Sequence, residues 1–189
     1  MEEWKEYKYT ELASLIGGGT PKTSNPSYWG GNIPWLSVKD FGNGSKYVYQ
    51  TEKSITEEGL NSSSTKLLQK DDIIISARGT VGEMAMLPFP MSFNQSCFGI
   101  RGNSLVDKDF LYYYTRTKIN ELKGSSHGSV FDTITRATFE KILCRIPSLP
   151  TQQKIANILS SLDDKIELNH RINDNLEQQA QALYKEWFV

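Results

Sequence analysis

The sequence predicts an α+β protein with a globular domain and a mixed β-sheet over residues 1–150, followed by one long helix over residues 151–189 that forms a coiled coil. Two observations support this fold class. In the first part, β-branched runs such as Ile73-Ile74-Ile75 alternate with Gly, Pro and Asn, which is typical of strands joined by turns. In the second part, apolar residues recur at alternating spacings of four and three, which predicts a helix with a narrow apolar seam.

The seam of the C-terminal helix consists of two series of residues seven positions apart. One series is Ile155, Leu162, Asn169, Leu176 and Leu183, and the other is Leu159, Ile166, Asn173, Ala180 and Trp187. Both series become polar at Asn169 and Asn173. Buried Asn weakens helix association but fixes the register, because a shifted partner would leave the amides unpaired. We therefore expect this seam to be a dimerisation surface.

The first 150 residues contain several shorter predicted elements. A strand and then a helical turn are expected within residues 4–16, ending at the three glycines 17–19. Further strands are expected at 35–40, 73–76, 83–87 and 93–100, a helix at 51–60, a helix at 110–123, and a short helix followed by a strand within 138–146. Pro147 and Pro150 mark the boundary, and Pro150 can occupy the first turn of the long helix.

Composition is ordinary for a soluble protein, with 38 % hydrophobic and 23 % charged residues and a net charge of −1. The N-terminus has no secretory pattern, and no apolar run approaches the roughly 20 residues of a membrane span. Cys97 and Cys144 are far apart and have no metal-ligand pattern. These features predict a reduced, cytoplasmic protein without membrane association.

Residue patterns that would indicate catalysis are not found. The Gly-Gly-Gly-Thr run at 17–20 is followed by Pro21 rather than by the Lys of a phosphate-binding loop. The acidic pairs Asp71-Asp72 and Asp163-Asp164 are interpreted as solvated surface. His127 and His170 have no further ligands at metal-binding spacing, so no metal site is expected. No Ser lies in a nucleophile motif.

Polar side chains in the expected loops are the remaining candidates for a binding site. They are Lys22, Lys39, Arg78, His127 and Ser129 in loops, and Gln95 beside Asn94 on an expected strand. Such side chains can contact DNA base edges, as Arg does guanine and Gln adenine. The same residue types occur in any soluble loop, and Arg78 before Gly79 can equally stabilise its own turn.

Several motifs taken together resemble a known family. They are Gly19-Thr20-Pro21, the aromatic loop at residues 28–35 (Tyr-Trp-Gly-Gly-Asn-Ile-Pro-Trp), Ile75 to Gly82, Asn94-Gln95, Ile146-Pro147, Gln153 to Ala156, Leu162-Asp163-Asp164-Lys165-Ile166 and Leu176 to Phe188. The chain resembles the specificity subunit of type I restriction–modification systems in a half-length form. The likeness covers nearly the whole chain.

The resemblance implies a target recognition domain at residues 1–150 and a conserved spacer helix at residues 151–189. The domain would recognise one half of a bipartite site in double-stranded DNA. The subunit would be non-catalytic and would hold no cofactor, since methyl transfer and cleavage belong to separate modification and restriction subunits. S-adenosylmethionine, ATP and Mg²⁺ are accordingly expected on those partner subunits.

Typical members of the family carry two recognition domains and two spacer helices, whereas this chain has one of each. We therefore expect a homodimer through the seam, which would recognise an inverted repeat with a gap. A helix of about 37 residues spans roughly 55 Å, or roughly 16 base pairs as an upper bound. The heptads do not fix the orientation of the pair, and the family implies an antiparallel one.

Two other functions remain as alternatives. The chain could be a regulatory half-subunit that pairs through its helix with a full-length specificity subunit. It could also be a self-contained nuclease, which is disfavoured because no set of metal-binding carboxylates is identifiable.

Overall fold

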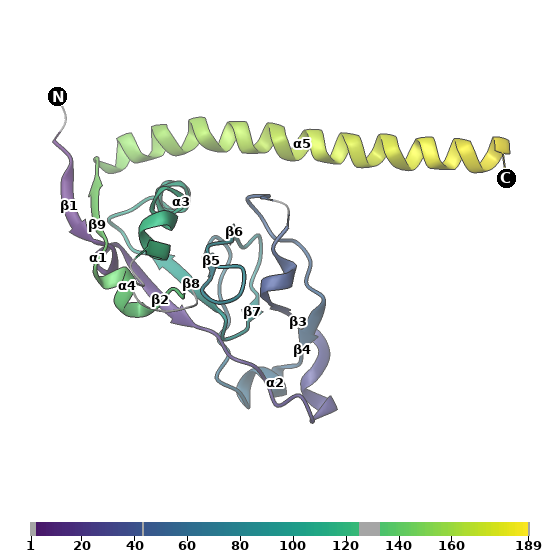
Figure 1. Cartoon of the computed structure of the whole chain (residues 1–189), viewed down its shortest axis with the longest axis horizontal. Coiled ribbons are helices and arrows are strands. Elements are labelled where there is room, and N and C mark those ends of the chain that lie inside the picture. The colour runs from purple at the N-terminus through teal and green to yellow at the C-terminus, as the bar shows by residue number, and fades with distance from the viewer. Residues whose placement is uncertain (1–2, 43, 125–132, 189) are drawn as a thin grey trace.

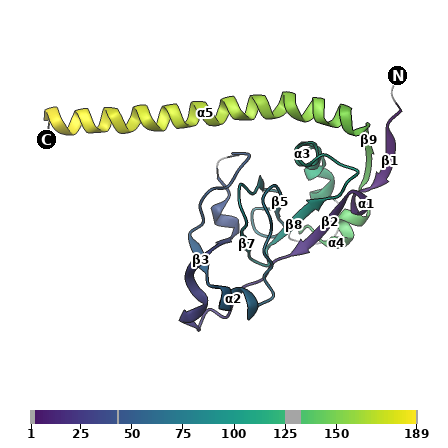
Figure 2. The same ribbon diagram turned by 180° about the vertical axis from the view of Figure 1, so that it is seen from behind.

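Helix α5 (Leu149–Phe188) is the longest element of the protein, with 40 residues, and extends beyond a domain built from the preceding chain (Figure 1). The computed structural model describes residues 3–42, 44–124 and 133–188. It confirms the α+β class and the long C-terminal helix. At about 1.5 Å per residue the helix is about 60 Å long. Figure 2 shows from the opposite side that its C-terminal half projects past the domain.

The domain is made of short strands and helices. In chain order they are β1 (Lys5–Lys8), α1 (Tyr9–Leu12), β2 (Ala13–Gly17), the 3₁₀ turn η1 (Pro26–Tyr28), β3 (Trp29–Leu36), the 3₁₀ turn η2 (Val38–Asp40), β4 (Lys53–Ile55), α2 (Glu57–Asn61), β5 (Ile73–Ser76), β6 (Met84–Met86), β7 (Ser92–Phe93), β8 (Cys97–Gly102), α3 (Lys108–Gly124), α4 (Arg136–Glu140) and β9 (Leu143–Ile146).

Among the described residues, the strands form three sheets. The central sheet has the order β2-β8-β5-β6 with antiparallel neighbours. A second sheet has the order β4-β3-β7 and is mixed, because β3 runs antiparallel to β4 and parallel to β7. The third pairs β1 with β9, so the N-terminal strand lies beside the strand that leads into α5.

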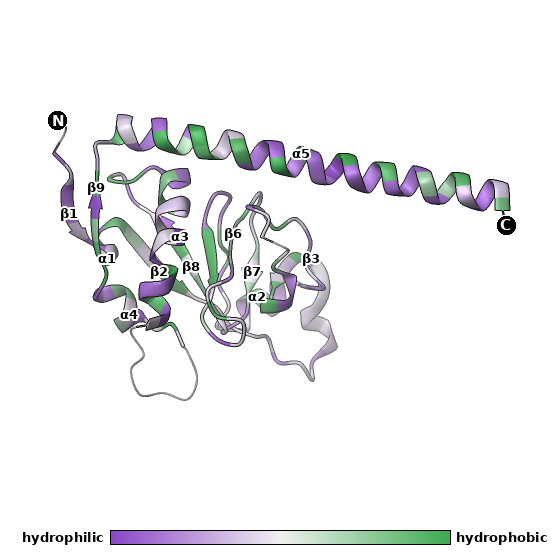
Figure 3. Ribbon diagram, turned by 45° about the horizontal axis from the view of Figure 1, so that its top comes forward, coloured by the Kyte–Doolittle hydropathy of each residue, from purple (hydrophilic) through white to green (hydrophobic). Residues whose placement is uncertain are grey.

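Both faces of the central strand β5 are buried, which explains its continuous β-branched sequence. Ile73 and Ile75 point into one cluster, which also holds Phe110 and Leu111 of α3. Ile74 points the other way, into a cluster with Phe93 and the start of β8. The hydropathy colouring shows apolar segments concentrated in these central strands, while α5 alternates between apolar and polar residues (Figure 3).

The first turns of α5 belong to the core of the domain. Ala156 is buried in the cluster that contains α3, and Ile155 packs partly against it. Gln152 is only 1 % exposed. Its side-chain oxygen accepts from the Asp107 amide at 2.9 Å, and its nitrogen donates to the carbonyl oxygens of Pro147 (2.9 Å) and Leu105 (3.2 Å). A polar side chain with every group bonded fixes the direction in which the helix leaves the domain.

Several local predictions differ from the structure. The helical turn in residues 4–16 comes earlier than expected, and strand β2 follows it. Gly18 and Gly19 do not end a helix. They are required because other backbone segments approach them closely, and a Cβ on Gly18 would overlap the Asn94 carbonyl. The expected helix at 51–60 is divided into β4 and α2, with the Thr56 side chain accepting from the Gly59 amide as the N-cap.

The prediction of a solvated Asp71-Asp72 pair is wrong for Asp72. Its side chain is buried, and Arg101 donates to both carboxylate oxygens at 2.8 and 2.5 Å. The Gln69 amide also donates to it at 2.7 Å. Asp71 lies partly exposed with a φ of 70° and pairs with Lys108 at 2.6 Å. The pair therefore holds the turn before β5 in place.

Replacing Gln152 with Leu should destabilise the domain, because it leaves the buried Pro147 carbonyl and two partly buried groups, the Asp107 amide and the Leu105 carbonyl, without their partner. We expect a loss of about 2–3 kcal/mol in the free energy of unfolding, measured by urea denaturation at fixed protein concentration. Gln153→Leu is the matched control, since this neighbour is exposed, and it should stay within about 0.5 kcal/mol. Equal effects of the two variants would contradict the structural role of Gln152.

Candidate nucleic-acid interface

A hollow of about 400 Å³ lies on the surface where β3, β4 and the turns after β5 and β7 meet. It is lined by Trp35, Ser37, Val38, Lys39, Asp40, Glu52, Lys53, Arg78, Gly79, Asn94 and Ser96. Three of these side chains, Lys39, Lys53 and Arg78, are basic and exposed. The three cations outnumber the two carboxylates of the hollow, Asp40 and Glu52, by one, and they lie beside amide and hydroxyl groups. This combination is suited to a polyanion with hydrogen-bonding edges.

One of the acidic residues in the hollow is engaged in holding the backbone. The Asp40 carboxylate accepts from the amide and hydroxyl of Ser37 at 2.7 and 2.8 Å. Its other oxygen accepts from the Glu52 amide at 2.7 Å. These bonds connect η2 to the segment before β4, so Asp40 supports the loop that carries Lys39.

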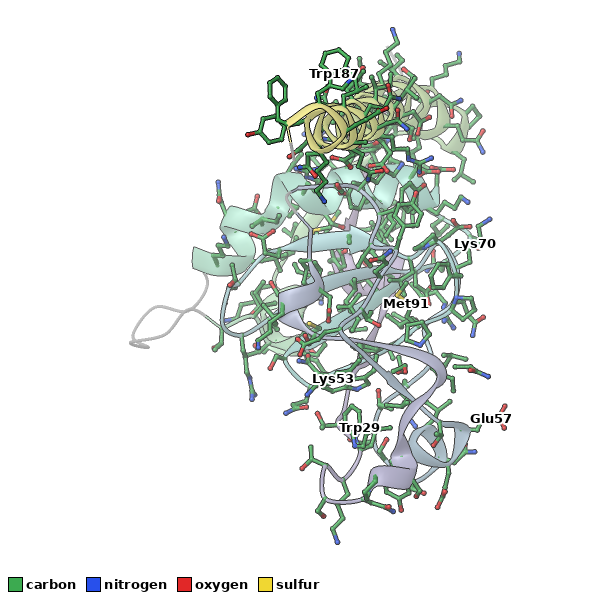
Figure 4. The ribbon with its side chains drawn as sticks, turned by 90° about the vertical axis from the view of Figure 1, so that its right-hand side faces the viewer. Trp29, Lys53, Glu57, Lys70, Met91 and Trp187 are labelled. Carbon is green, nitrogen blue, oxygen red and sulfur yellow. The ribbon has the colours of Figure 1, made fainter. Side chains whose placement is uncertain are left out.

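Two tryptophans connect the N-terminal loop to the floor of the hollow. Trp29 and Trp35 pack edge to face with ring centroids 5.2 Å apart. The Trp35 indole donates to the Gly19 carbonyl at 3.0 Å, and the Trp29 indole donates to the Lys22 carbonyl at 3.4 Å. The Lys53 ammonium lies 5.7 Å from the Trp29 ring. Figure 4 shows Trp29 and Lys53 on the part of the domain that lies away from α5.

The turns that carry Arg78 and Gln95 are adjacent. The amides of Ala77 and Arg78 both donate to the Ser96 carbonyl, at 2.7 and 3.2 Å. Gly79 has a φ of 79°, which lets the chain reverse immediately after Arg78. Gln95 accepts a hydrogen bond from the Thr20 hydroxyl. These contacts place the Arg78 turn and the Gly19–Thr20 loop against the same β7–β8 turn.

The structure brings some of the predicted binding residues together. Lys39 and Arg78 line the same hollow, and Lys22 lies in the neighbouring loop. Gln95 lies in the turn between β7 and β8 rather than on a strand, and so does Asn94. His127 and Ser129 lie outside the described residues.

Sequence reasoning missed Lys53, which lines both this hollow and a neighbouring one that includes Trp29. Its position follows from strand pairing, since Lys53 of β4 stands opposite Trp35 of β3. A Lys between a Glu and a Ser gives no pattern in the sequence, so only the sheet register could have identified it.

The described residues hold no other obvious chemistry. No group of three or more His, Cys, Asp or Glu side chains that could hold a metal lies within 3–42, 44–124 and 133–188. Burial raises the pKa of Cys97 to about 12 and that of Cys144 to about 11, so both thiols are protonated and unsuited to nucleophilic catalysis. No helix in the described chain is long and apolar enough to span a bilayer.

The seam on α5 is a second surface, separate from the hollow. Leu162, Leu176 and Trp187 are 53 %, 57 % and 72 % exposed. The side of α5 that faces the domain carries Ala156, Ser160 and Asp163. Because Ile155, Leu159 and Leu162 each precede one of these residues by one position, the seam lies about 100° around the helix from the domain-facing side. Ile155 and Leu159 are partly covered, and from Leu162 onward the domain leaves the seam exposed.

The structure combines a globular domain, which has a hollow lined by three cations, with a projecting helix that carries an exposed apolar seam. The family model described as "Type I restriction modification DNA specificity domain" matches residues 1–178. The chain belongs to this family, as the sequence motifs predicted.

Relatives in the family are longer than this chain. It is 35 % identical over 192 residues to the MjaIX specificity subunit of Methanocaldococcus jannaschii, covering all of this chain and 44 % of that protein. It is 27 % identical to the EcoR124I/EcoR124II specificity subunit of Escherichia coli, covering 98 % of this chain and 46 % of the relative. The chain thus spans less than half the length of these curated relatives.

Two solved structures have the same fold. The S subunit of a type I restriction–modification system from M. genitalium superposes with a TM-score of 0.70 over 99 % of this chain and 46 % of its own, at 18 % identity. The HsdS subunit from Thermoanaerobacter tengcongensis gives a TM-score of 0.65 over 98 % and 40 %, at 20 % identity. At such identities the likeness supports the fold alone.

Proposed function

We propose that this chain is a sequence-specific DNA-binding specificity subunit of a type I restriction–modification complex. In this proposal residues 1–150 are the target recognition domain, and residues 151–189 are the spacer and dimerisation helix. The observation that carries the proposal is the basic hollow lined by Lys39, Lys53 and Arg78 in a chain of the specificity family. The domain recognises one half-site and positions the catalytic subunits on the DNA.

The hollow supplies two kinds of contact that DNA recognition requires. Lys39 and Lys53 are flexible cations suited to phosphates, which fix the position of the domain on the duplex. Arg78 can donate two parallel hydrogen bonds to a guanine edge, and the Asn94 amide can pair with adenine. The turns that carry Arg78 and Asn94 are bonded to each other, so these contacts require little ordering on binding.

The exposed seam supports a homodimer. With Asn169 of one copy opposite Asn173 of the other, an antiparallel pair aligns every seam position with a seam position. The remaining layers are Ile155 with Trp187, Leu159 with Leu183, Leu162 with Ala180, and Ile166 with Leu176. Two of these layers set a larger side chain against a smaller one, Trp187 against Ile155 and Leu162 against Ala180. A parallel pair would instead set Trp187 against Trp187 and Ala180 against Ala180. The size match supports the antiparallel pair, which has a recognition domain at each end.

Catalysis belongs to other subunits in this proposal. The modification and restriction subunits would carry S-adenosylmethionine, ATP and Mg²⁺, and this chain would hold none of them. Its place in the cytoplasm follows from that partnership with DNA and catalytic subunits. We propose the helix pair and the adjoining domain surface as the platform on which those subunits assemble.

A second function is favoured by the same seam. Since the chain spans less than half of its curated relatives, its helix could instead pair with a longer specificity subunit and alter the target of that subunit. Co-purification with a full-length relative, without a gel shift by the chain alone, would support this regulatory function over the first one.

Replacing both Leu162 and Leu176 with Lys should convert the dimer to a monomer, because four charges would be buried, one in each of four layers of the antiparallel pair. Light scattering at micromolar concentration should show half the mass of the unchanged chain, and binding to an inverted-repeat DNA should weaken strongly. Gln153→Lys and Glu177→Lys, at exposed positions outside the seam, form the matched double control. An unchanged chain that is already monomeric at this concentration would refute the dimer.

Alanine at Lys39, Lys53 or Arg78 should weaken DNA binding. Each substitution that removes a phosphate contact should reduce the slope of log K against log salt by about 1, while loss of a base contact should cost about 1–3 kcal/mol and relax specificity at one position. Lys70→Ala is the control, because Figure 4 shows Lys70 well apart from Lys53. Unchanged affinity and slope in all three variants would exclude the hollow as the DNA interface.

The target itself can be read from methylation. Cells that contain the modification subunit with this chain should methylate an interrupted inverted repeat, and cells without the chain should not. Genome-wide sequencing of methylated bases measures both. A target with two unrelated half-sites would contradict a symmetric dimer and favour pairing with a longer subunit.

A further inference from the structure

Lys46 is a buried lysine that connects the central sheet to both long helices. It lies in the segment between η2 and β4, where the Met86 amide of β6 donates to its carbonyl at 2.7 Å. Its side chain is 5 % exposed. Backbone pairing with β6 therefore fixes the base of this side chain to the sheet, and the ammonium group extends toward α3 and α5.

The ammonium group of Lys46 binds both helices at once. It donates to the Asp109 carboxylate in the first turn of α3 at 2.7 Å and to the Ser160 hydroxyl of α5 at 2.9 Å. The rings of Tyr47, Tyr112 and Tyr113 surround it, with centroids 5.4, 5.7 and 5.0 Å from the nitrogen. A cation enclosed by a carboxylate and three aromatic faces is restricted to one position.

A second contact between α3 and α5 lies beside it. The Tyr113 hydroxyl donates its proton to the Asp163 carboxylate at 2.6 Å, and its oxygen lies 3.3 Å from the Ser160 hydroxyl oxygen. Burial and the hydrogen bond to Asp163 both raise the pKa of Tyr113, so the phenol remains a donor throughout the physiological range. Asp163, expected to be solvated, is thus half-buried and bonded. We call Lys46, Asp109, Tyr113, Ser160 and Asp163 the Lys46 cluster.

Beyond the Lys46 cluster the helix leaves the domain. A hollow of about 370 Å³ separates α5 from the segment around Tyr49, and Glu167 and Arg171 line its helix side. Arg171 reaches across to the Tyr49 ring at 6.0 Å. From Leu168 to Phe188 every residue is exposed. The cluster is therefore the last buried polar contact before the projecting part of the helix.

We propose that the Lys46 cluster fixes the angle between the recognition domain and α5, and so determines how many base pairs separate the two half-sites. This inference rests on the proposed DNA-binding dimer. Apolar contacts alone allow a helix to slide and rock, whereas a buried ammonium with directional partners favours one arrangement. About 25 residues of helix follow the cluster, or about 38 Å, so a tilt of about 5° moves the helix end by about 3 Å. That displacement is about one base-pair step.

Selection from a pool of randomised duplex DNA tests this role. The unchanged chain should enrich an inverted repeat with one spacer length. Lys46→Met, which keeps the apolar stem and removes the charge, should enrich the same half-sites with several spacer lengths, so that the preference for the best spacer falls severalfold. Lys108→Met is the matched control, since Lys108 pairs with Asp71 on the domain surface, and it should keep the single spacer length. A folded Lys46→Met chain that keeps the single spacer length would overturn the proposal.

A distance measurement separates this inference from the DNA-binding function. Spin labels are attached to the chain through Glu57→Cys in α2 and Lys185→Cys in α5, and the labelled chain is diluted with unlabelled chain. The distance between the two labels reports the domain–helix angle in the absence of DNA. The native cysteines are buried and should resist labelling. Lys46→Met should broaden the distance distribution, and Lys108→Met should not. If the unchanged chain enriches no repeat, the DNA-binding function fails, whereas an unbroadened distribution refutes the angular role.

A milder variant covers the case in which Lys46→Met does not fold. Tyr113→Phe removes the phenol hydroxyl and keeps the ring beside the ammonium group. It should broaden both the spacer lengths and the distances, by less than Lys46→Met. A Tyr113→Phe chain identical to the unchanged one in both measurements would also overturn the proposal.

Discussion

Helix α5 carries two stripes of side chains about 100° apart, and its own domain covers one of them. The covered stripe carries Ala156, Ser160 and Asp163, which contact the core, Lys46 and Tyr113. The other stripe is the seam, which is exposed from Leu162 onward. Because the first stripe fixes the rotation of the helix about its axis, it also determines which direction the seam faces. The direction in which a second helix can pair therefore depends on this rotation.

The rotation is set by polar groups as much as by apolar packing. Gln152 bonds the first turn of α5 to the chain before α3 and after β9, and Ser160 and Asp163 bond it two and three turns later. Apolar area would stabilise the contact in many rotations, whereas each hydrogen bond is lost if the helix turns by one residue. The polar residues therefore select one orientation from those that burial alone would allow.

The hollow also contains two kinds of residue, those that hold the backbone in place and those that are exposed. The residues that carry the family motifs, such as Trp35, Gly19 and the Gly79 turn, hold backbone segments against one another. The exposed cations around the hollow lie on the backbone segments that these motif residues hold in place. Under the proposed function, such a domain can change its exposed side chains, and with them its DNA target, without loss of the framework. This explains why motif residues alone identify the family but not the bases that are recognised.

The sequence predicted the features that depend on a pattern within one segment. The seam of α5 and helix α3 follow from periods of 3.5 and 3.6 residues, and the buried strand β5 follows from its continuous run of β-branched residues. The β2 strand, the Asp72–Arg101 pair and the position of Lys53 depend on contacts between segments distant in the chain, and no local pattern encodes them. Gln152 and Lys46 are of the same kind, since a buried polar residue is recognisable only by partners that folding brings together.

The hollow and the seam lie on different parts of the molecule, so the contact between the domain and α5 determines how they are placed relative to each other. The hollow lies on the part of the domain away from α5 (Figure 4), and the seam lies on the helix beyond it. If two copies join through their seams, the only path from one hollow to the other runs through both domain–helix contacts. Errors in the angle at each contact then add along that path, while the helix pair itself remains rigid. A short polar cluster near the point where the helix leaves the domain controls the separation of the hollows more strongly than any residue farther along α5.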